Sequence, residues 1–158
     1  MGSVVTEKIG RLYFEDLEVG QKFTSETYVM DAERIKKFAA EFDPQFFHLD
    51  EIAATESVFG GLAASGWHTA AVAMRLLTTS GLNLANGILG LGGEISWTRP
   101  TRPGDTLRVE SEIVEIRPSR SKPQEGIVTL RSTMVNQNGE AVYLLTAKLL
   151  VARRPRGD

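Results

Sequence analysis

The sequence contains no cysteine and only two histidines among its 158 residues. Without cysteine there is no disulfide bond, no thiol nucleophile and no thiolate metal site. Two histidines without a His-x-x-x-His spacing also argue against a metal centre, and we expect neither a metal nor another cofactor. The lack of cysteine fits a reducing compartment, so we expect a cytoplasmic protein.

The chain also lacks an excess of either charge. Its formal net charge is −2, which gives no reason to expect a basic face for nucleic acid. Between Ser57 and Gly93 the only charged residue is Arg75, but glycines and His68 interrupt this stretch too often for a membrane span. A hydrophobic content of 42% and a charged content of 24% are typical of a folded globular domain. We therefore expect a domain that binds neither nucleic acid nor a membrane.

Several recognisable sequence signals are missing as well. Neither a glycine-rich phosphate loop nor a nucleophile elbow occurs in the chain. The start, MGSVVTEKIG, lacks the apolar core of a signal peptide. We expect a flexible N-terminal segment over 1–11, one domain over 12–152 and a basic C-terminal tail over 153–158.

The first half of the chain predicts one strand and a first helix. Residues 21–30 are rich in aromatic and β-branched side chains, which favour a strand. Asp31 can cap a following helix, and Pro44 disfavours helical geometry at the residue before it. Apolar residues at helical spacing predict the buried face of that helix: Ile35, Phe38, Ala39 and Phe42. After Pro44 we expect a loop.

Two further helices are predicted before the chain changes character. Asp50 can cap a short helix, and Ser65 can start a longer one over about 66–80. The longer helix is apolar nearly all round, which predicts that protein surrounds it.

The second half predicts about four long antiparallel strands. The expected strands cover 87–100, 106–117 with a bulge, 127–135 and 141–151, with a turn at 102–105 and an Asn-Gly turn near 138. The last strands carry apolar residues on both faces, so both faces should be covered. The order of elements indicates an α+β fold with an antiparallel sheet wrapped around one buried helix.

The segment FDPQFFHLD…FGGLAASGW resembles the MaoC-like dehydratases, relatives of the (R)-specific enoyl-CoA hydratases, which have the hot-dog fold. The similarity covers about residues 12–152 and includes YFEDLEVGQKF and WTRPTRPGDTL. In that family an aspartate and a histidine five residues later hold a water, and a glycine amide at the start of the central helix binds the thioester oxygen. The resemblance carries these roles to Asp43, His48 and Gly66.

The chemistry of hydration gives a separate reason for the same residues. Adding water to a 2-enoyl thioester needs a base, an acid and a donor for the enolate oxygen. We expect Asp43 to be the base and His48 to orient the water and relay a proton. Gly66 offers a free N–H at a helix start, and its missing Cβ should let the thioester carbonyl approach.

One departure from the family pattern leaves a second acid open. The hydratases usually read Asp-x-Asn-Pro-x-His, whereas this chain has proline four residues before His48. An alignment on the proline would put Glu41 in the acid position. The Asp-to-His spacing and the following HLD favour Asp43.

Other residues are candidates for the substrate site. Ser65, Trp67, Phe47 and Trp97 are expected to contact substrate, and Phe46 is a further candidate for an acyl pocket, although any one of the aromatic residues can equally belong to the core. Arg99, Arg102 and the terminal Arg153, Arg154 and Arg156 are candidates for coenzyme A phosphates, with solvated surface charge as the alternative. His68 is interpreted as a packed histidine or pocket wall.

The expected substrate is an acyl-CoA or acyl-carrier-protein thioester. The fold also hosts acyl-CoA thioesterases, and a non-catalytic acyl-binding subunit is a further alternative. Strands that are apolar on both faces, with one helix covering one side, leave apolar surface on a monomer, so we expect a homodimer or a higher homo-oligomer.

Overall fold

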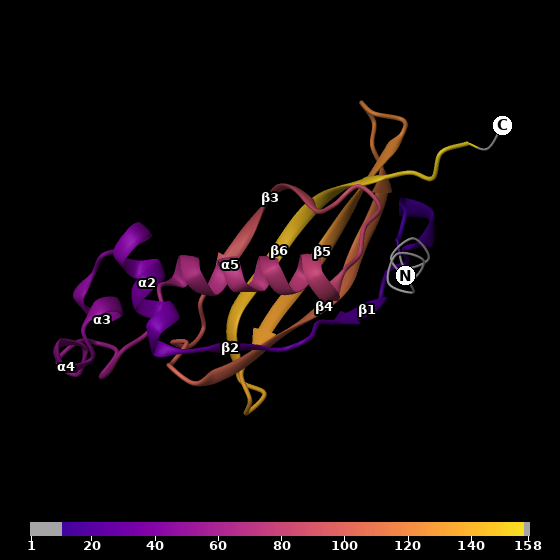
Figure 1. Ribbon diagram of the computed structural model, residues 1–158. Helices are drawn as coiled ribbons and strands as arrows, with labels where there is room; N and C mark the ends of the chain where they lie inside the picture. The colour runs from indigo at the N-terminus through magenta and orange to yellow at the C-terminus, as the bar shows by residue number, and fades with distance from the viewer. Residues whose placement is uncertain (1–10, 157–158) are drawn as a thin grey trace, which may run out of the picture.

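The computed structural model describes residues 11–156. A central helix, α5 (Gly66–Leu76), lies across one face of a curved antiparallel sheet (Figure 1). The strands run in the order β1-β4-β5-β6-β3, and β2 also pairs with β4. Their bounds are β1 (Lys22–Thr24), β2 (Tyr28–Met30), β3 (Leu89–Ser96), β4 (Asp105–Pro118), β5 (Glu125–Val135) and β6 (Ala141–Ala152).

The long strands confirm the alternation seen in the sequence. In β4, Leu107, Val109 and Ile113 are buried on the helix side of the sheet, and the register with β5 shifts between Ile113 and Glu115. This shift is the predicted bulge. The buried face of α5, which includes Val72, completes the core between helix and sheet.

The predicted strand over 21–30 is instead two short strands. Ser25 lies between β1 and β2, where its side-chain Oγ accepts a hydrogen bond from Val109 N at 2.8 Å. Its backbone N–H donates to Val109 O at 2.9 Å. A serine side chain that takes a backbone partner competes with the regular ladder, and this explains the interruption.

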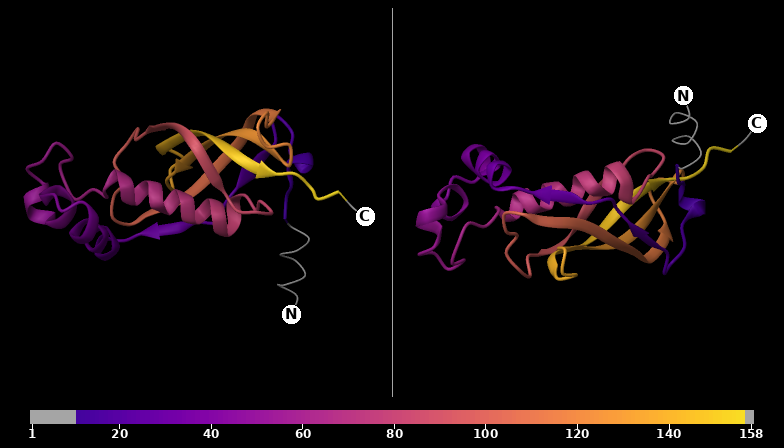
Figure 2. Two further views of the ribbon diagram at one scale, coloured as in Figure 1. Left: turned by 90° about the horizontal axis from the view of Figure 1, so that it is seen from above. Right: turned by 60° about the horizontal axis from the view of Figure 1, so that its bottom comes forward.

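Three helices form a layer beyond one end of the sheet (Figures 1 and 2), and a 3₁₀ turn, η1 (Phe14–Asp16), precedes β1. α2 (Ala32–Phe42) starts at Asp31, whose carboxylate accepts from Arg34 N, and it ends before Pro44 as predicted.

Two expectations for this region are wrong. The segment directly after Pro44 is not a loop but one helical turn, α3 (Phe46–Leu49). The next helix, α4 (Glu51–Ala54), is capped by Asp50 as predicted. Phe42 is 64% exposed, because the last turn of α2 extends past the core.

The central helix is capped by Ser65, as predicted, and continues into a wider turn, η2 (Leu77–Gly81). One face of this helix is exposed in the single chain, where Trp67 is 60% and Met74 is 44% exposed. The expectation that protein surrounds the helix is therefore wrong for this face. The edge strand β3 is exposed along its whole length.

No helix within residues 11–156 is long and apolar enough to cross a bilayer. The N-terminal segment predicted at 1–11 falls, except for Arg11, outside the described residues, as do the last two residues of the predicted tail.

Candidate active site

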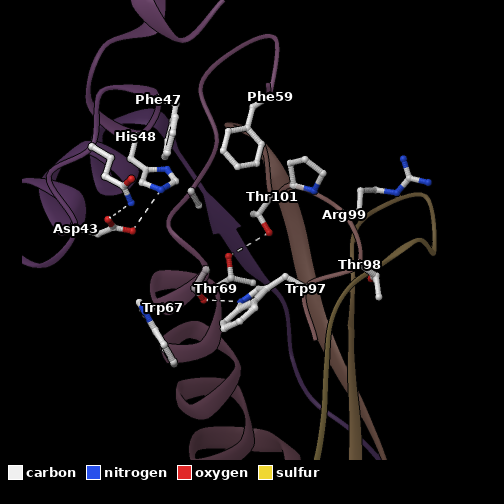
Figure 3. Close-up of a pocket in the computed structure, with 14 residues that line it drawn as sticks. Asp43, Phe47, His48, Phe59, Trp67, Thr69, Trp97, Thr98, Arg99 and Thr101 are labelled. Atoms are coloured by element: carbon white, nitrogen blue, oxygen red, sulfur yellow. Dashed lines mark hydrogen bonds and ion pairs between the residues drawn. The ribbon is translucent and has the colours of Figure 1, made fainter. Parts of the chain in front are cut away.

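The two residues of the predicted Asp–His pair lie side by side (Figure 3). Asp43 ends α2, where its N–H donates to Ala39 O, and His48 lies in the single turn of α3. His48 Nε2 is 3.3 Å from Asp43 Oδ2. The histidine is almost fully buried, at 4% exposure, whereas Asp43 is partly exposed. Pro44 turns the chain between the two helices, so the side chains converge across this corner.

A backbone carbonyl fixes the orientation of the histidine ring. His48 Nδ1 is 2.6 Å from Ala63 O. A carbonyl oxygen only accepts hydrogen bonds, so Nδ1 carries a proton. Nε2, which faces Asp43, is therefore the nitrogen that can exchange a proton with a substrate or water.

The Asp43 carboxylate accepts two short hydrogen bonds from neighbouring side chains. Ser65 Oγ donates to Oδ2 at 2.6 Å, and Gln45 Nε2 donates to Oδ1 at 2.6 Å. Burial raises the pKa of Asp43, but the hydrogen bonds from Ser65 and Gln45 and the charge of His48 together lower this pKa below its usual value. The carboxylate is therefore ionised at neutral pH.

Sequence reasoning missed Gln45. The signal was available, because Gln45 stands two residues after Asp43, where the usual hydratase pattern has asparagine. Both amides can donate a hydrogen bond back to the aspartate.

Ser65 links the pair to the start of α5. It is completely buried and does not line the cavity, so the structure gives the predicted contact of Ser65 with substrate no support. Its Oγ accepts from Trp67 N at 3.3 Å as the helix cap, while it donates to Asp43. The next residue, Gly66, has the first N–H of the helix, which has no acceptor within the helix and lies at the positive end of its dipole.

The place of the missing Gly66 Cβ is already filled. A Cβ built there would lie 2.8 Å from Trp97 Cε2 and 2.9 Å from Trp97 Nε1. The expectation that the missing Cβ leaves room for the thioester carbonyl is therefore wrong, since the indole ring occupies that position. Trp97 Nε1 also donates to Gly66 O at 2.8 Å (Figure 3).

A cavity of about 470 Å³ opens beside these groups. Asp43, His48 and Gly66 line it, together with the predicted aromatic residues Phe47, Trp67 and Trp97 and with Phe59, Thr69 and Thr101. Phe46 is half exposed and lies outside the lining. The cavity thus brings the Asp43–His48 pair and the helix-start N–H of Gly66 to one space that is partly lined by aromatic side chains.

Comparisons with known proteins agree with this geometry. Residues 15–136 match the MaoC-like domain family. This chain belongs to the MaoC-like dehydratase family. It has the hot-dog fold, in which the antiparallel sheet wraps around α5.

Three relatives illustrate the match of this MaoC-like chain. A MaoC-like dehydratase from Rhodospirillum rubrum is 59% identical, with a TM-score of 0.90 over 92% of this chain and 99% of that one. The R-hydratase PhaJ1 from Pseudomonas aeruginosa is 27% identical, with a TM-score of 0.74 over 94% of this chain and 93% of that one. The 3-hydroxybutyryl-CoA dehydratase of Methylorubrum extorquens is 28% identical over 138 residues, which are 87% of this chain and 86% of that protein.

The arginines of the MaoC-like chain occupy different places. Arg99 lines the cavity and pairs with Glu140 at 3.1 Å. Arg102 turns inward and donates to the carbonyls of Phe59, Gly61 and Leu62. It therefore fixes the loop that precedes Ala63 and Ser65, a contact that the sequence did not reveal.

The C-terminal arginines lie at the other end of the molecule (Figures 1 and 2). Arg153 contacts Glu15 and Arg154 contacts Asp16, so each is paired far from the Asp43–His48 pair.

His68 faces away from this cavity. Its ring stacks on Phe38 with 4.6 Å between centroids, which agrees with its interpretation as a packed histidine. Burial and the nearby charge of Arg34 lower the pKa of His68, so it is neutral at pH 7.

Proposed function

We propose that this MaoC-like protein is a hydro-lyase that adds water to a 2-enoyl thioester, or removes it from a 3-hydroxyacyl thioester. The observation that carries the proposal is the Asp43–His48 pair, 3.3 Å apart, in one cavity with the free N–H end of α5. Relatives named as an R-hydratase and as a 3-hydroxybutyryl-CoA dehydratase support the same reaction class.

In the direction of hydration, the reaction needs four coordinated events. Water bonds through its oxygen to C3 while Asp43 takes one of its protons. The electron pair of the C2–C3 double bond moves toward the thioester carbonyl, whose oxygen receives the Gly66 N–H. Asp43 passes the water's proton across the short separation to Nε2 of His48. His48 then delivers this proton to C2, which restores the pair.

We propose that the position of the pair sets the relative stereochemistry of the addition. Both residues lie on one wall of the cavity, so water and proton reach the same face of the double bond. We propose (R)-specific hydration, which the similarity to the R-hydratase PhaJ1 supports.

We further propose coenzyme A as the thioester carrier, with an acyl carrier protein as the alternative. The 3-hydroxybutyryl-CoA dehydratase among the relatives favours coenzyme A. The same proposal includes a homodimer, because the apolar edge strand β3 and the exposed side of α5 lack a covering layer within residues 11–156. No metal or other cofactor is required by the steps above.

A thioesterase is the main competing function, since it also uses an acidic residue and a helix-start donor. The two are separated by mixing the protein with crotonyl-CoA while following the ultraviolet absorbance of the enoyl thioester. A parallel sample with butyryl-CoA is assayed for free thiol. A hydratase removes the chromophore without releasing thiol. Thiol release from butyryl-CoA without loss of the enoyl chromophore would contradict the proposal.

A further inference from the structure

Trp97 makes two separate contacts with the residue that starts α5. Its indole Nε1 donates to Gly66 O at 2.8 Å. Its ring also occupies the position of a Gly66 Cβ, with ring atoms 2.8–2.9 Å from that position. Figure 3 shows the indole against the first turn of the helix, with the hydrogen bond drawn.

The indole itself is held from several directions. Trp67 packs edge-on against it with 5.3 Å between centroids, and Tyr143 of β6 lies 6.3 Å away. The following residue, Thr98, is anchored to β6 by its Oγ1, which donates to Ala141 O at 2.6 Å. The ring is therefore held by the sheet, through Tyr143 and Thr98, as well as by Trp67 of the helix that it contacts.

The start of α5 needs such support. Glycine has the greatest backbone freedom of any residue, and the first N–H of a helix has no acceptor within the helix to orient it. The Ser65 cap is long, at 3.3 Å to Trp67 N. The peptide that carries the Gly66 N–H is held through Ser65 O, which accepts from Thr69 N at 3.0 Å. The next peptide is held from outside the helix by Trp97, which donates to Gly66 O.

We propose that Trp97 is a positioning residue that holds Gly66 so that its N–H points at the thioester oxygen. The inference rests on the proposed hydratase function, and it adds a residue that acts through Gly66 rather than on substrate. It also links the edge strand β3, which leads into Trp97, to the stabilisation of negative charge in the cavity.

The structural alternative is that Trp97 only forms a wall of the cavity. Trp97→Phe separates the two roles, because it keeps an aromatic wall and removes the N–H donor. If Trp97 positions Gly66, kcat for crotonyl-CoA hydration falls at least about tenfold, while KM changes less than about threefold. Trp67→Phe is the matched comparison on the same wall, and its larger effect is expected on KM.

A double-mutant cycle in stability tests the contact without using activity. Gly66→Ala forces a methyl group into the indole, so it should lower Tm by about 3 °C or more. Trp97→Leu removes the ring, so in that background Gly66→Ala should cost less than about 1 °C.

The proposal requires both results. A kcat for Trp97→Phe within about twofold of wild type would overturn it, and so would an equal loss of Tm from Gly66→Ala in both backgrounds. A wild-type protein without hydratase activity is a different outcome, since it refutes the proposed function, while the stability cycle still reports whether Trp97 holds Gly66.

Discussion

At the scale of single residues, the proposed hydration depends on which carboxylate works with His48. Glu41 is exposed on α2 and is not part of the cavity lining, whereas Asp43 lies 3.3 Å from His48. We expect Asp43→Asn and His48→Ala each to lower kcat at least about 100-fold, because each removes a proton-transfer group. Steady-state hydration of crotonyl-CoA measures this.

Glu41→Gln is the matched control for that pair of variants. It makes the same change of acid to amide two residues away, and it should leave kcat within about twofold of wild type. Loss of turnover in Glu41→Gln with full activity in Asp43→Asn would mean that the acid is misassigned.

A Gln45 variant tests what lowers the pKa of Asp43. The pKa of Asp43 lies below its usual value although burial raises it, because hydrogen bonds from Ser65 and Gln45 and the charge of His48 lower it by more. Gln45→Ala removes one of these hydrogen bonds, so the pKa of Asp43 should rise. Activity that needs ionised Asp43 is lost as pH falls through this pKa, so the acidic limb of kcat/KM should move to higher pH.

The control for the pH profile is Gln124→Ala, since Gln124 is an exposed glutamine far from the cavity. Its acidic limb should match that of the wild type. An unshifted limb in Gln45→Ala would show that the amide does not act on Asp43. The same lowered pKa makes the Asp43 carboxylate stabilise the fold above its unfolded pKa, a contribution that disappears as pH falls through the folded pKa.

The sequence pointed to some residues of the candidate site and not to others. The resemblance to the MaoC-like dehydratases pointed to Asp43 and His48, and the capping rules identified Ser65 as a helix cap. Trp97 and Arg102 contact partners about 30–40 residues away through backbone carbonyls. Such contacts depend on tertiary packing, which spacing alone does not encode.

At the scale of elements, capping residues predicted the helices better than apolar patterns predicted their burial. Asp31, Asp50 and Ser65 each cap a helix where the sequence indicated. The burial of Phe42 was predicted wrongly, because periodicity says which residues share a helix face but not how far the core extends along it. The interruption between β1 and β2 at Ser25 depends on a hydrogen-bond partner in β4, so the local sequence did not predict it.

The loop before α5 gives an element-scale prediction. The guanidinium of Arg102 donates to three carbonyls of this loop. The single ammonium group of a lysine can replace only some of these hydrogen bonds. We expect Arg102→Lys to lower the free energy of unfolding by about 2 kcal/mol in urea denaturation. It should also lower kcat, because the loop leads into Ala63, which orients His48.

Arg108→Lys is the matched control on β4. Arg108 pairs with exposed Glu110, and such surface pairs contribute less than about 1 kcal/mol. Equal stability of Arg102→Lys and wild type would mean that the guanidinium hydrogen bonds of Arg102 do not hold the loop.

At the scale of the whole molecule, the exposed apolar side chains predict self-association. They follow the edge strand and the outer side of α5: Trp67, Met74, Leu89, Leu91, Ile95 and Trp97. A patch of this kind on a single chain indicates an interface. We expect a dimer at micromolar concentration in light scattering, and we expect Leu91→Asp to shift it toward monomer.

Val19→Asp is the control, since Val19 is equally apolar and 64% exposed but lies in the turn before β1. It should remain dimeric. A wild-type monomer at micromolar concentration would contradict the proposed homodimer.

We propose above all that this chain hydrates enoyl thioesters with the Asp43–His48 pair. The most direct measurement is product analysis after incubation with crotonyl-CoA, using mass spectrometry and chiral separation of the hydrolysed acid. We expect a product that is heavier by one water and has the (R) configuration, and we expect Asp43→Asn to form it at least about 100-fold more slowly than the wild type. Unchanged crotonyl-CoA with the folded wild-type protein, or equal rates for the two proteins, would contradict it.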